Sequence, residues 1–198
     1  PAVADLGADV DLQDQALAFT RRWLAGGPAP EGDMRTPMLA MAALAAPVPA
    51  LGLYEQMAER AARTVDTSEQ SAWLGAAMRL GAPELNQRAL ATLLHHTTDL
   101  TVALPALLDG AAHTEEGRSA ALRFITTHRA ALAARSGRDA PAGWPWYFSG
   151  ACGMGEARLI EQTFAPLAAR AQGGQRQLAQ VLDGVRMCAA WRQAQPPS

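Results

Sequence analysis

The sequence predicts an all-α fold, because its apolar residues recur at helical spacing along the chain. The pattern is clearest after Gly173-Gly174, where apolar residues fall at i, i+3, i+4, i+7 and i+10 and form one stripe. No segment alternates like a half-buried strand, and Asp109-Gly110 lies in a helical context rather than between β-branched runs. The stripe residues are Leu178, Val181, Leu182, Val185 and Cys188.

Glycine, proline and hydroxyl residues divide the N-terminal part of the chain into expected helices. Pro1 to Asp9 is expected to be a frayed end, and a helix from Val10 is stopped by Gly26-Gly27-Pro28. Thr36-Pro37 predicts the next helix start, with the hydroxyl as N-cap and proline at the first helical position. That helix is broken at Pro47 and Pro49.

The same residue types mark the starts and ends of helices in the middle of the chain. Thr67 can cap a helix with Gln70 placed to close a capping box. The expected helix before it carries Tyr54, Met57, Ala58, Ala61 and Val65. Gly81 is expected to end the helix capped by Thr67, and Pro83 to open another.

The C-terminal half continues as helices and short connections. Asp99 can cap a segment that runs through Leu108, although Pro105 is expected to kink or shorten it. Thr114 predicts the start of a further helix. The other expected elements are a loop from Ser136 to Gly143, an aromatic cluster with a Cys, a helix that ends near Arg170, and the last helix.

These signals predict about nine or ten helices of ~10–17 residues with short connections. Helices joined by short loops pack antiparallel, so the predicted architecture is a superhelical array of antiparallel helix hairpins, an α-solenoid of HEAT or armadillo type, with no sheet. Residues 1–198 are expected to form a single α-helical repeat domain. The chain starts at Pro1 without a signal sequence, so we expect an excised piece or a processed form.

The composition argues against several classes of function. Of the 198 residues, 49% are hydrophobic and 18% charged, and the formal net charge of −2 gives no electrostatic basis for binding nucleic acid. No apolar run reaches the ~18 residues of a membrane span. All 17 basic residues are Arg, which rules out a Schiff-base lysine and the lysine of a phosphate-binding loop.

The four His do not form a predicted metal site. A helical zinc site of the HExxH type needs two His one turn apart. His95 and His96 are adjacent, so on a helix they point about 100° apart and cannot share a metal. His113 is followed by Thr-Glu-Glu-Gly, and His128 stands alone on an apolar stripe. We therefore expect hydrogen-bonded or partly exposed His side chains.

The two Cys, Cys152 and Cys188, are too few for a disulfide framework. Three interpretations are open: core packing, a disulfide, or a nucleophile or metal ligand. Cys is among the most buried residue types, Cys188 lies on the stripe of the last helix, and Cys152 follows the aromatic cluster. We expect both to be reduced, buried and inert.

Three further groups have both a chemical and a structural interpretation. The aromatic cluster could stack a ligand, but core packing at the end of a domain is expected. Gly153-Met154-Gly155-Glu156 and Glu115-Glu116 are expected to be acidic first turns of helices. The sequence has no Gly-x-Ser-x-Gly, no phosphate-binding loop after a strand and no Cys-x-x-Cys, so no catalytic, cofactor-binding or metal residue is predicted. The aromatic cluster is Trp144, Trp146, Tyr147 and Phe148.

Three segments carry a pattern in their order and spacing. Trp73 to Leu94 reads WLGAAMRLGAPELNQRALATLL and Gly117 to Arg135 reads GRSAALRFITTHRAALAAR. The third, Cys152 to Cys188, has Phe164 before the Gly-Gly break and Arg176, Leu178, Gln180 and Leu182 after it. Together they resemble the C-terminal helical domain of the aminopeptidase N-like zinc aminopeptidases, the gluzincin family with HExxH and a distant Glu. The family usually has a Trp before the Phe-Ile of the second segment, where this chain has Ala121 and Leu122.

The resemblance implies a fold and a role. In that family this domain is an α-solenoid that closes over the catalytic domain and bounds the substrate chamber, while the zinc ligands and the general-base Glu lie upstream. It implies a non-catalytic C-terminal domain of an enzyme that removes N-terminal residues from peptides. Its expected partners are the parent's own catalytic domain and the peptide substrate, with zinc only in the upstream domain. The alternative is a free-standing helical-repeat interaction module. We expect a soluble protein, in the cytoplasm rather than the periplasm.

The two ends of the chain are expected to differ. The last helix should cover the core of the hairpin before it, as the terminal helix of a repeat array does. The first helix would continue from preceding structure in a parent enzyme, so Leu12, Phe19 and Trp23 are expected to be only partly covered. An uncovered apolar patch of that kind marks a partner surface.

Overall fold

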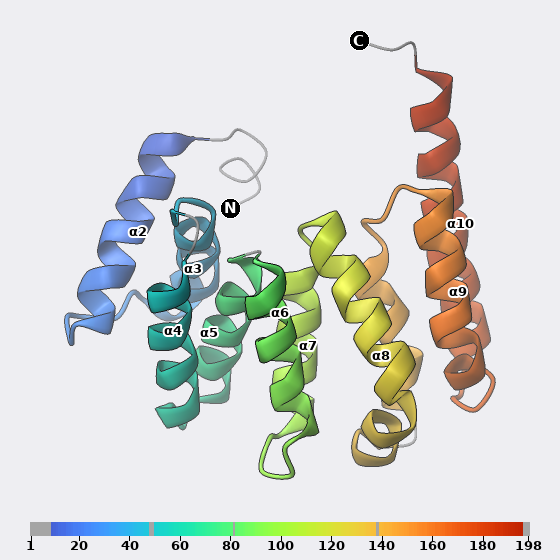
Figure 1. The fold of residues 1–198 in the computed structure, drawn as a ribbon, viewed down its shortest axis with the longest axis horizontal. Coiled ribbons are helices and arrows are strands. Elements are labelled where there is room, and N and C mark those ends of the chain that lie inside the picture. The colour runs from blue at the N-terminus through green and yellow to red at the C-terminus, as the bar shows by residue number, and fades with distance from the viewer. Residues whose placement is uncertain (1–8, 48–49, 81, 138, 196–198) are drawn as a thin grey trace.

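The computed structural model describes residues 9–47, 50–80, 82–137 and 139–195, and all its regular structure there is helical, as predicted (Figure 1). Short 3-10 segments, labelled η, connect some of the α-helices. The α-helices are α2 (Val10–Leu24), α3 (Arg35–Leu44), α4 (Leu51–Arg63), α5 (Thr67–Arg79), α6 (Pro83–Ala91), α7 (Leu100–Ala111), α8 (Glu115–Arg135), α9 (Met154–Ala168) and α10 (Gly174–Ala194). The 3-10 segments are η1 (Gly32–Met34), η2 (Thr92–Leu94), η3 (Ala140–Ala142) and η4 (Trp144–Phe148).

The helices follow one another along the longest axis of the molecule, with α2 at one end and α9 and α10 at the other (Figure 1). Helices α3, α5 and α7 pack one against the next, α4 packs on α5, and α8 contacts both α7 and α9. A connected cluster of buried apolar side chains extends from Trp23 on α2 to Val185 on α10. The hydrophobic core therefore spans the described chain from one end to the other.

Several helices begin where the sequence predicts. The Asp99 carboxylate accepts a hydrogen bond from the Thr101 N–H at 2.8 Å and caps α7, and the Thr114 hydroxyl accepts one from the Gly117 N–H at 3.0 Å and caps α8. Pro83 opens α6. The N–H groups of the first helical turn have no partner within the helix. Asp99 and Thr114 each accept a hydrogen bond from one of these groups, whereas Pro83 has no N–H group that needs a partner.

Two predicted helix starts are wrong by one or two residues. Helix α5 is capped by Asp66, whose carboxylate accepts from the Ser68 and Glu69 N–H groups, instead of by a Thr67–Gln70 capping box. A carboxylate accepts more strongly than a hydroxyl, which favours the earlier cap. Helix α3 already begins at Arg35, because η1 leads directly into it.

Asp9, expected in the frayed end, caps α2 by accepting a hydrogen bond from the Leu12 N–H at 3.0 Å. The rest of that end, residues 1–8, and the expected breaks at Pro49 and Gly81 lie outside the described residues. Between residues 136 and 143 the expected loop contains η3, and the aromatic cluster forms η4. Each of these 3-10 segments has a proline in its first positions, where the fixed φ of proline fits a helical turn.

Helix α7 continues to Ala111 with Pro105 inside it, so the expected shortening does not occur. The helix is held by a close contact with α5. A Cβ atom on Gly110 would lie 2.5 Å from the Gly75 carbonyl oxygen, so the two backbones meet at a point where only glycine fits. Packing on both sides of α7 can offset the free-energy cost of the backbone hydrogen bond that Pro105 cannot make.

Candidate functional site

A groove crosses the surface of α3, α5, α7 and η4. It consists of two cavities of about 240 and 260 Å³ that share Pro105 and Tyr147. Small residues make the hollow, because they leave space where larger side chains would fill the surface between neighbouring helices. The small residues of the first cavity are Ala40 on α3, Ala72, Gly75 and Ala76 on α5, and Ala106 on α7.

An ion pair supplies charge to the first cavity. The Arg79 Nη2 atom lies 3.3 Å from the Asp109 Oδ2 atom, which joins α5 to α7 across the groove. The Arg79 side chain is only 10% exposed, whereas the Asp109 side chain is 58% exposed. A guanidinium has five N–H donors, so Arg79 can bind a further carbonyl or carboxylate while it keeps its partner.

Tyr147 stands where the two cavities meet. Its partial burial raises the pKa of the phenol above its ordinary value of 10.0, and the nearby Asp109 carboxylate raises it further. The hydroxyl therefore remains protonated at neutral pH. It can donate one hydrogen bond and accept others, while its ring forms an apolar wall.

The lining of this groove also contains hydroxyl groups. Thr36 and Ser71 supply hydroxyls, but the described lining includes no His or Cys that could act as a base or nucleophile. A larger cavity of about 400 Å³ lies between α4, α5, α6 and α7. It is lined mainly by alanine, threonine and leucine, and its one carboxylate, Asp99, is already used as the α7 cap.

The four His are spread over the molecule. His95, His96 and His113 are exposed, and the half-buried His128 packs on Phe124 with 4.6 Å between the ring centroids. Within the described ranges no group of three or more His, Cys, Asp or Glu is placed to hold a metal ion. In the same ranges no helix is both long and apolar enough to cross a membrane.

The prediction that both Cys are reduced is wrong, because Cys152 and Cys188 form a disulfide with their Cα atoms 5.1 Å apart. Cys152 is buried and Cys188 is half-buried. The physical reason is the packing of α10 against η4 and the turn after it, which brings together two residues separated by 36 positions.

The aromatic cluster divides into core and surface residues. Trp144 and Phe148 are buried, and Phe148 packs against Phe164 of α9 with 5.5 Å between the ring centroids. Tyr147 lines the groove, while Trp146 is 48% exposed. The expected core role therefore holds for two of its members and fails for Trp146.

Glu156 does more than the first-turn role expected for it. One carboxylate oxygen lies 2.7 Å from the Arg118 Nε atom, and the other accepts a hydrogen bond from the Cys152 N–H at 3.2 Å. Both charged side chains are 13% exposed. The pair thus ties α8 to the turn that carries the disulfide. Glu115 and Glu116, by contrast, are exposed in the first turn of α8, as expected.

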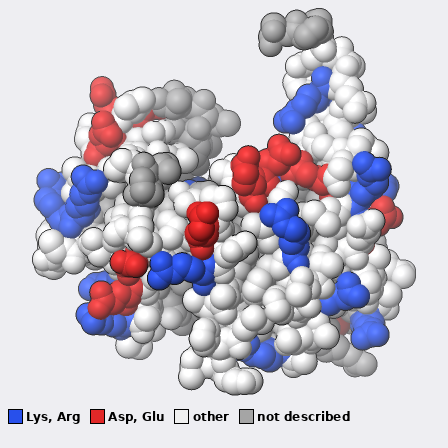
Figure 2. All heavy atoms as spheres, viewed as in Figure 1, with Lys and Arg blue, Asp and Glu red and all other residues white. Residues whose placement is uncertain are grey.

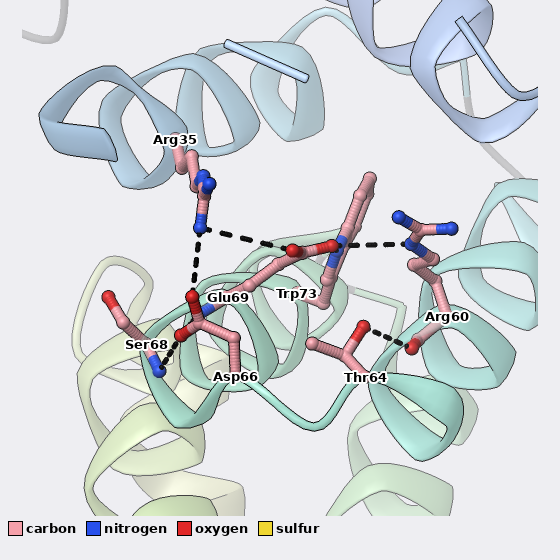
Figure 3. Close-up of polar contacts among 7 residues, drawn as sticks. All are labelled: Arg35, Arg60, Thr64, Asp66, Ser68, Glu69 and Trp73. Atoms are coloured by element: carbon pink, nitrogen blue, oxygen red, sulfur yellow. Dashed lines mark hydrogen bonds and ion pairs between the residues drawn. The ribbon is translucent and has the colours of Figure 1, made fainter. Parts of the chain in front are cut away.

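A polar network around Glu69 was not apparent in the sequence (Figure 3). The Glu69 carboxylate accepts hydrogen bonds from the Trp73 indole N–H at 3.2 Å and from Arg60 at 3.3 Å. Arg35 on α3 lies 3.9 Å from the same carboxylate and donates to Asp66 at 3.2 Å. The network joins α3, α4 and α5.

Comparison with known proteins finds no family model, no curated protein and no solved structure that matches the chain.

Proposed function

We propose that this chain is the non-catalytic C-terminal helical domain of an aminopeptidase N-like zinc aminopeptidase, with its helices arranged as a superhelical array of antiparallel hairpins. In this role it bounds the chamber that holds the peptide substrate. The groove across α3, α5, α7 and η4 is the observation that carries the proposal. The zinc ion and the general base belong to the upstream catalytic domain.

The lining of the groove fits a peptide in extended form. Small side chains such as Gly75 and Ala106 let a peptide backbone approach the helices closely. Arg79 and Tyr147 supply donors for peptide carbonyl groups, and Asp109 supplies an acceptor for N–H groups. A wall of this kind holds the part of the peptide that is distant from the scissile bond.

The first experiment tests the class of protein. The isolated chain should hydrolyse no aminoacyl-anilide and should retain no stoichiometric zinc after dialysis. The coding sequence upstream of Pro1 should contain HExxH and a distant Glu. One tightly held zinc per chain with peptidase activity would overturn the non-catalytic role. An upstream sequence without that motif would support a free-standing interaction module instead.

The second experiment tests the groove in the full-length enzyme. Thr36 is exposed at the edge of the groove, so Thr36→Trp fills the groove without changing the core. We expect KM for long peptides to rise several-fold, while hydrolysis of a short aminoacyl-anilide stays unchanged. Ala179→Trp on the exposed face of α10 is the matched control and should change neither value. Equal KM values for Thr36→Trp and Ala179→Trp would contradict the proposed chamber wall.

A further inference from the structure

The cavity of about 400 Å³ between α4, α5, α6 and α7 has a mostly apolar lining. It is larger than either cavity of the groove described above, and its volume is within the range of small-molecule sites. Short alanine side chains leave this space open, and Leu74 and Leu107 add apolar surface. The alanines are Ala58, Ala61, Ala62, Ala77, Ala89 and Ala103. An apolar molecule could therefore replace water here with a favourable change in free energy.

Several hydrogen-bonding side chains of this lining are already bonded to the backbone. The Thr92 hydroxyl donates to the Ala89 carbonyl at 2.6 Å, and the Thr98 hydroxyl donates to the Thr92 carbonyl at 2.7 Å. The Gln70 side-chain amide donates to the Ala61 carbonyl at 3.2 Å. These groups stabilise the helices and turns around the cavity, and their hydrogen bonds do not require a ligand.

Tyr54 on α4 differs from these groups because its hydroxyl is unpaired. The residue lines the cavity and is only 5% exposed, yet its hydroxyl makes no hydrogen bond within the described part of the chain. Its oxygen is not closed off from solvent, in contrast to the unpaired Asn86 Oδ1 atom, so a ligand in the cavity can reach it. Burial raises the pKa of the Tyr54 phenol above 10.0, so the hydroxyl keeps its proton at neutral pH and can donate it in a hydrogen bond.

The charges around the cavity favour an uncharged ligand. The Arg88 guanidinium lies 5.5 Å from the centre of the Tyr54 ring, but it is already paired with Glu55 at 3.7 Å. Figure 2 shows acidic and basic side chains side by side over α6, next to α4. Among the described lining residues, Asp99 is the one charged group, and it repels anions. A cation would gain little from Asp99, which is exposed to water, and would lose hydration among the alanines.

We propose that the cavity between α4, α5, α6 and α7 binds a small neutral molecule that has an apolar body and one acceptor oxygen, such as an alcohol or ketone of medium length. The Tyr54 hydroxyl donates a hydrogen bond to that oxygen, and the apolar body lies against the alanines and Leu107. This inference does not depend on the proposed function, which concerns the groove across α3, α5, α7 and η4.

Titration of the unmodified chain with three related probes, followed by NMR at neutral pH, tests the ligand class. 1-Hexanol is neutral, hexanoate carries a negative charge, and hexylammonium carries a positive charge. We expect 1-hexanol to cause saturable shifts of the amide signals of Tyr54, Ala58 and Ala89. Each ion should bind at least ~10-fold more weakly, which corresponds to ~1.4 kcal/mol. No saturable shift with 1-hexanol, or an ion that binds as tightly as 1-hexanol, would overturn the proposal.

Variants then locate the site. Tyr54→Phe keeps the ring and removes only the unpaired hydroxyl, so the chain should stay folded and bind 1-hexanol several-fold more weakly. Tyr147→Phe removes another partly buried phenol oxygen and is the matched control, which should leave the affinity unchanged. Ala58→Phe fills the cavity from a half-buried position on α4 and should abolish binding, whereas Ala179→Phe on the exposed face of α10 should not. Equal affinities of Tyr54→Phe and the unmodified chain, or binding that survives in Ala58→Phe, would refute the assignment.

Discussion

The two ends of the molecule are held to the core in different ways. At the N-terminal end, Trp23 of α2 is 2% exposed and packs against Trp73 of α5 with 4.3 Å between the ring centroids. At the C-terminal end, α10 is held by a row of aliphatic side chains and by the disulfide to Cys152. The N-terminal end combines this aromatic contact with a small apolar cluster, in which Ala16 and Leu17 of α2 pack on Met41 and Ala42 of α3. The C-terminal end combines small apolar contacts with a covalent bond.

The outer faces of both terminal helices expose large apolar side chains. Leu12 on α2 is 39% exposed and Phe19 is half-buried, so part of the apolar surface expected to be uncovered is indeed uncovered. Trp23 is the exception to that expectation, because Trp73 covers it. The exposed side chains of α10 include the polar Arg176, Gln180 and Asp183, but also Met187 at 70% and Trp191 at 65% exposure.

The largest difference is expected from truncation. Removing residues 173–198 deletes Leu178, Val181, Leu182 and Val185, all of which are buried. Each contributes roughly 1.5–3 kcal/mol of transfer free energy, and a whole domain is stable by only ~5–15 kcal/mol. The product should be unfolded or aggregated, as measured by circular dichroism and size-exclusion chromatography.

Removal of residues 1–26 is the matching truncation at the other end. It exposes Trp73 by removing Trp23, so the melting temperature should fall, but a cooperative transition should remain. The contrast between the two ends would be wrong if the N-terminal truncation abolished folding and the C-terminal truncation were tolerated.

Trp23→Ala should give the largest effect of a single substitution at the N-terminal end. It leaves a cavity against Trp73, and the loss of a buried aromatic side chain costs about 3–5 kcal/mol. Chemical denaturation gives the free energy of unfolding. Leu12→Ala on the exposed part of the same helix is the control and should cost much less. Equal losses for the two variants would show that the aromatic contact does not anchor α2.

The disulfide should contribute somewhat less than Trp23. It closes a loop across a separation of 36 residues, for which chain entropy predicts about 2–4 kcal/mol. Reductant should therefore lower the melting temperature of the native chain and leave a Cys152→Ala/Cys188→Ala double variant unchanged. Two free thiols in denaturant without reductant would contradict the bond.

The sequence predicts most helices of this molecule because their signals are local. The Asp99, Thr114 and Pro83 helix starts depend on residues within one turn, and the apolar stripe of α10 depends on spacing alone. The disulfide and the Trp23–Trp73 contact depend on which helices become neighbours, and spacing carries no such information.

The groove was not predicted for the same reason. Its lining comes from α3, α5, α7 and η4, and residues such as Ala72 and Gly75 have no distinctive pattern in the sequence. Tyr147 was singled out only as a member of the aromatic cluster. Its position between two cavities follows from the packing of η4 on α7.

The smallest expected effect concerns pH and separates the middle of the chain from its C-terminal end. Helices α5 and α7 are capped by aspartates, whereas α9 and α10 follow Gly153 and Gly173 and have no side-chain cap. Hydrogen bonds from the Glu69 and Ser68 N–H groups lower the pKa of Asp66 below 3.8.

The pKa of Asp99 is lowered in the same way, by hydrogen bonds from the Thr101 hydroxyl and then from its N–H. The pKa values of Asp66 and Asp99 are lower in the folded chain than in the unfolded chain. The two caps therefore stabilise the fold fully at pH values above the pKa of an unfolded-state Asp. This stabilisation is lost as the pH falls from ~5 through the folded-state values. The Asp66→Asn/Asp99→Asn variant keeps a capping oxygen but cannot titrate, so its stability should fall less steeply with acid than that of the native chain. Urea midpoints at several pH values measure this slope, and Asp183→Asn on α10 controls for the loss of a surface charge. Identical slopes for the native chain and the double variant would show that these caps do not govern the acid response.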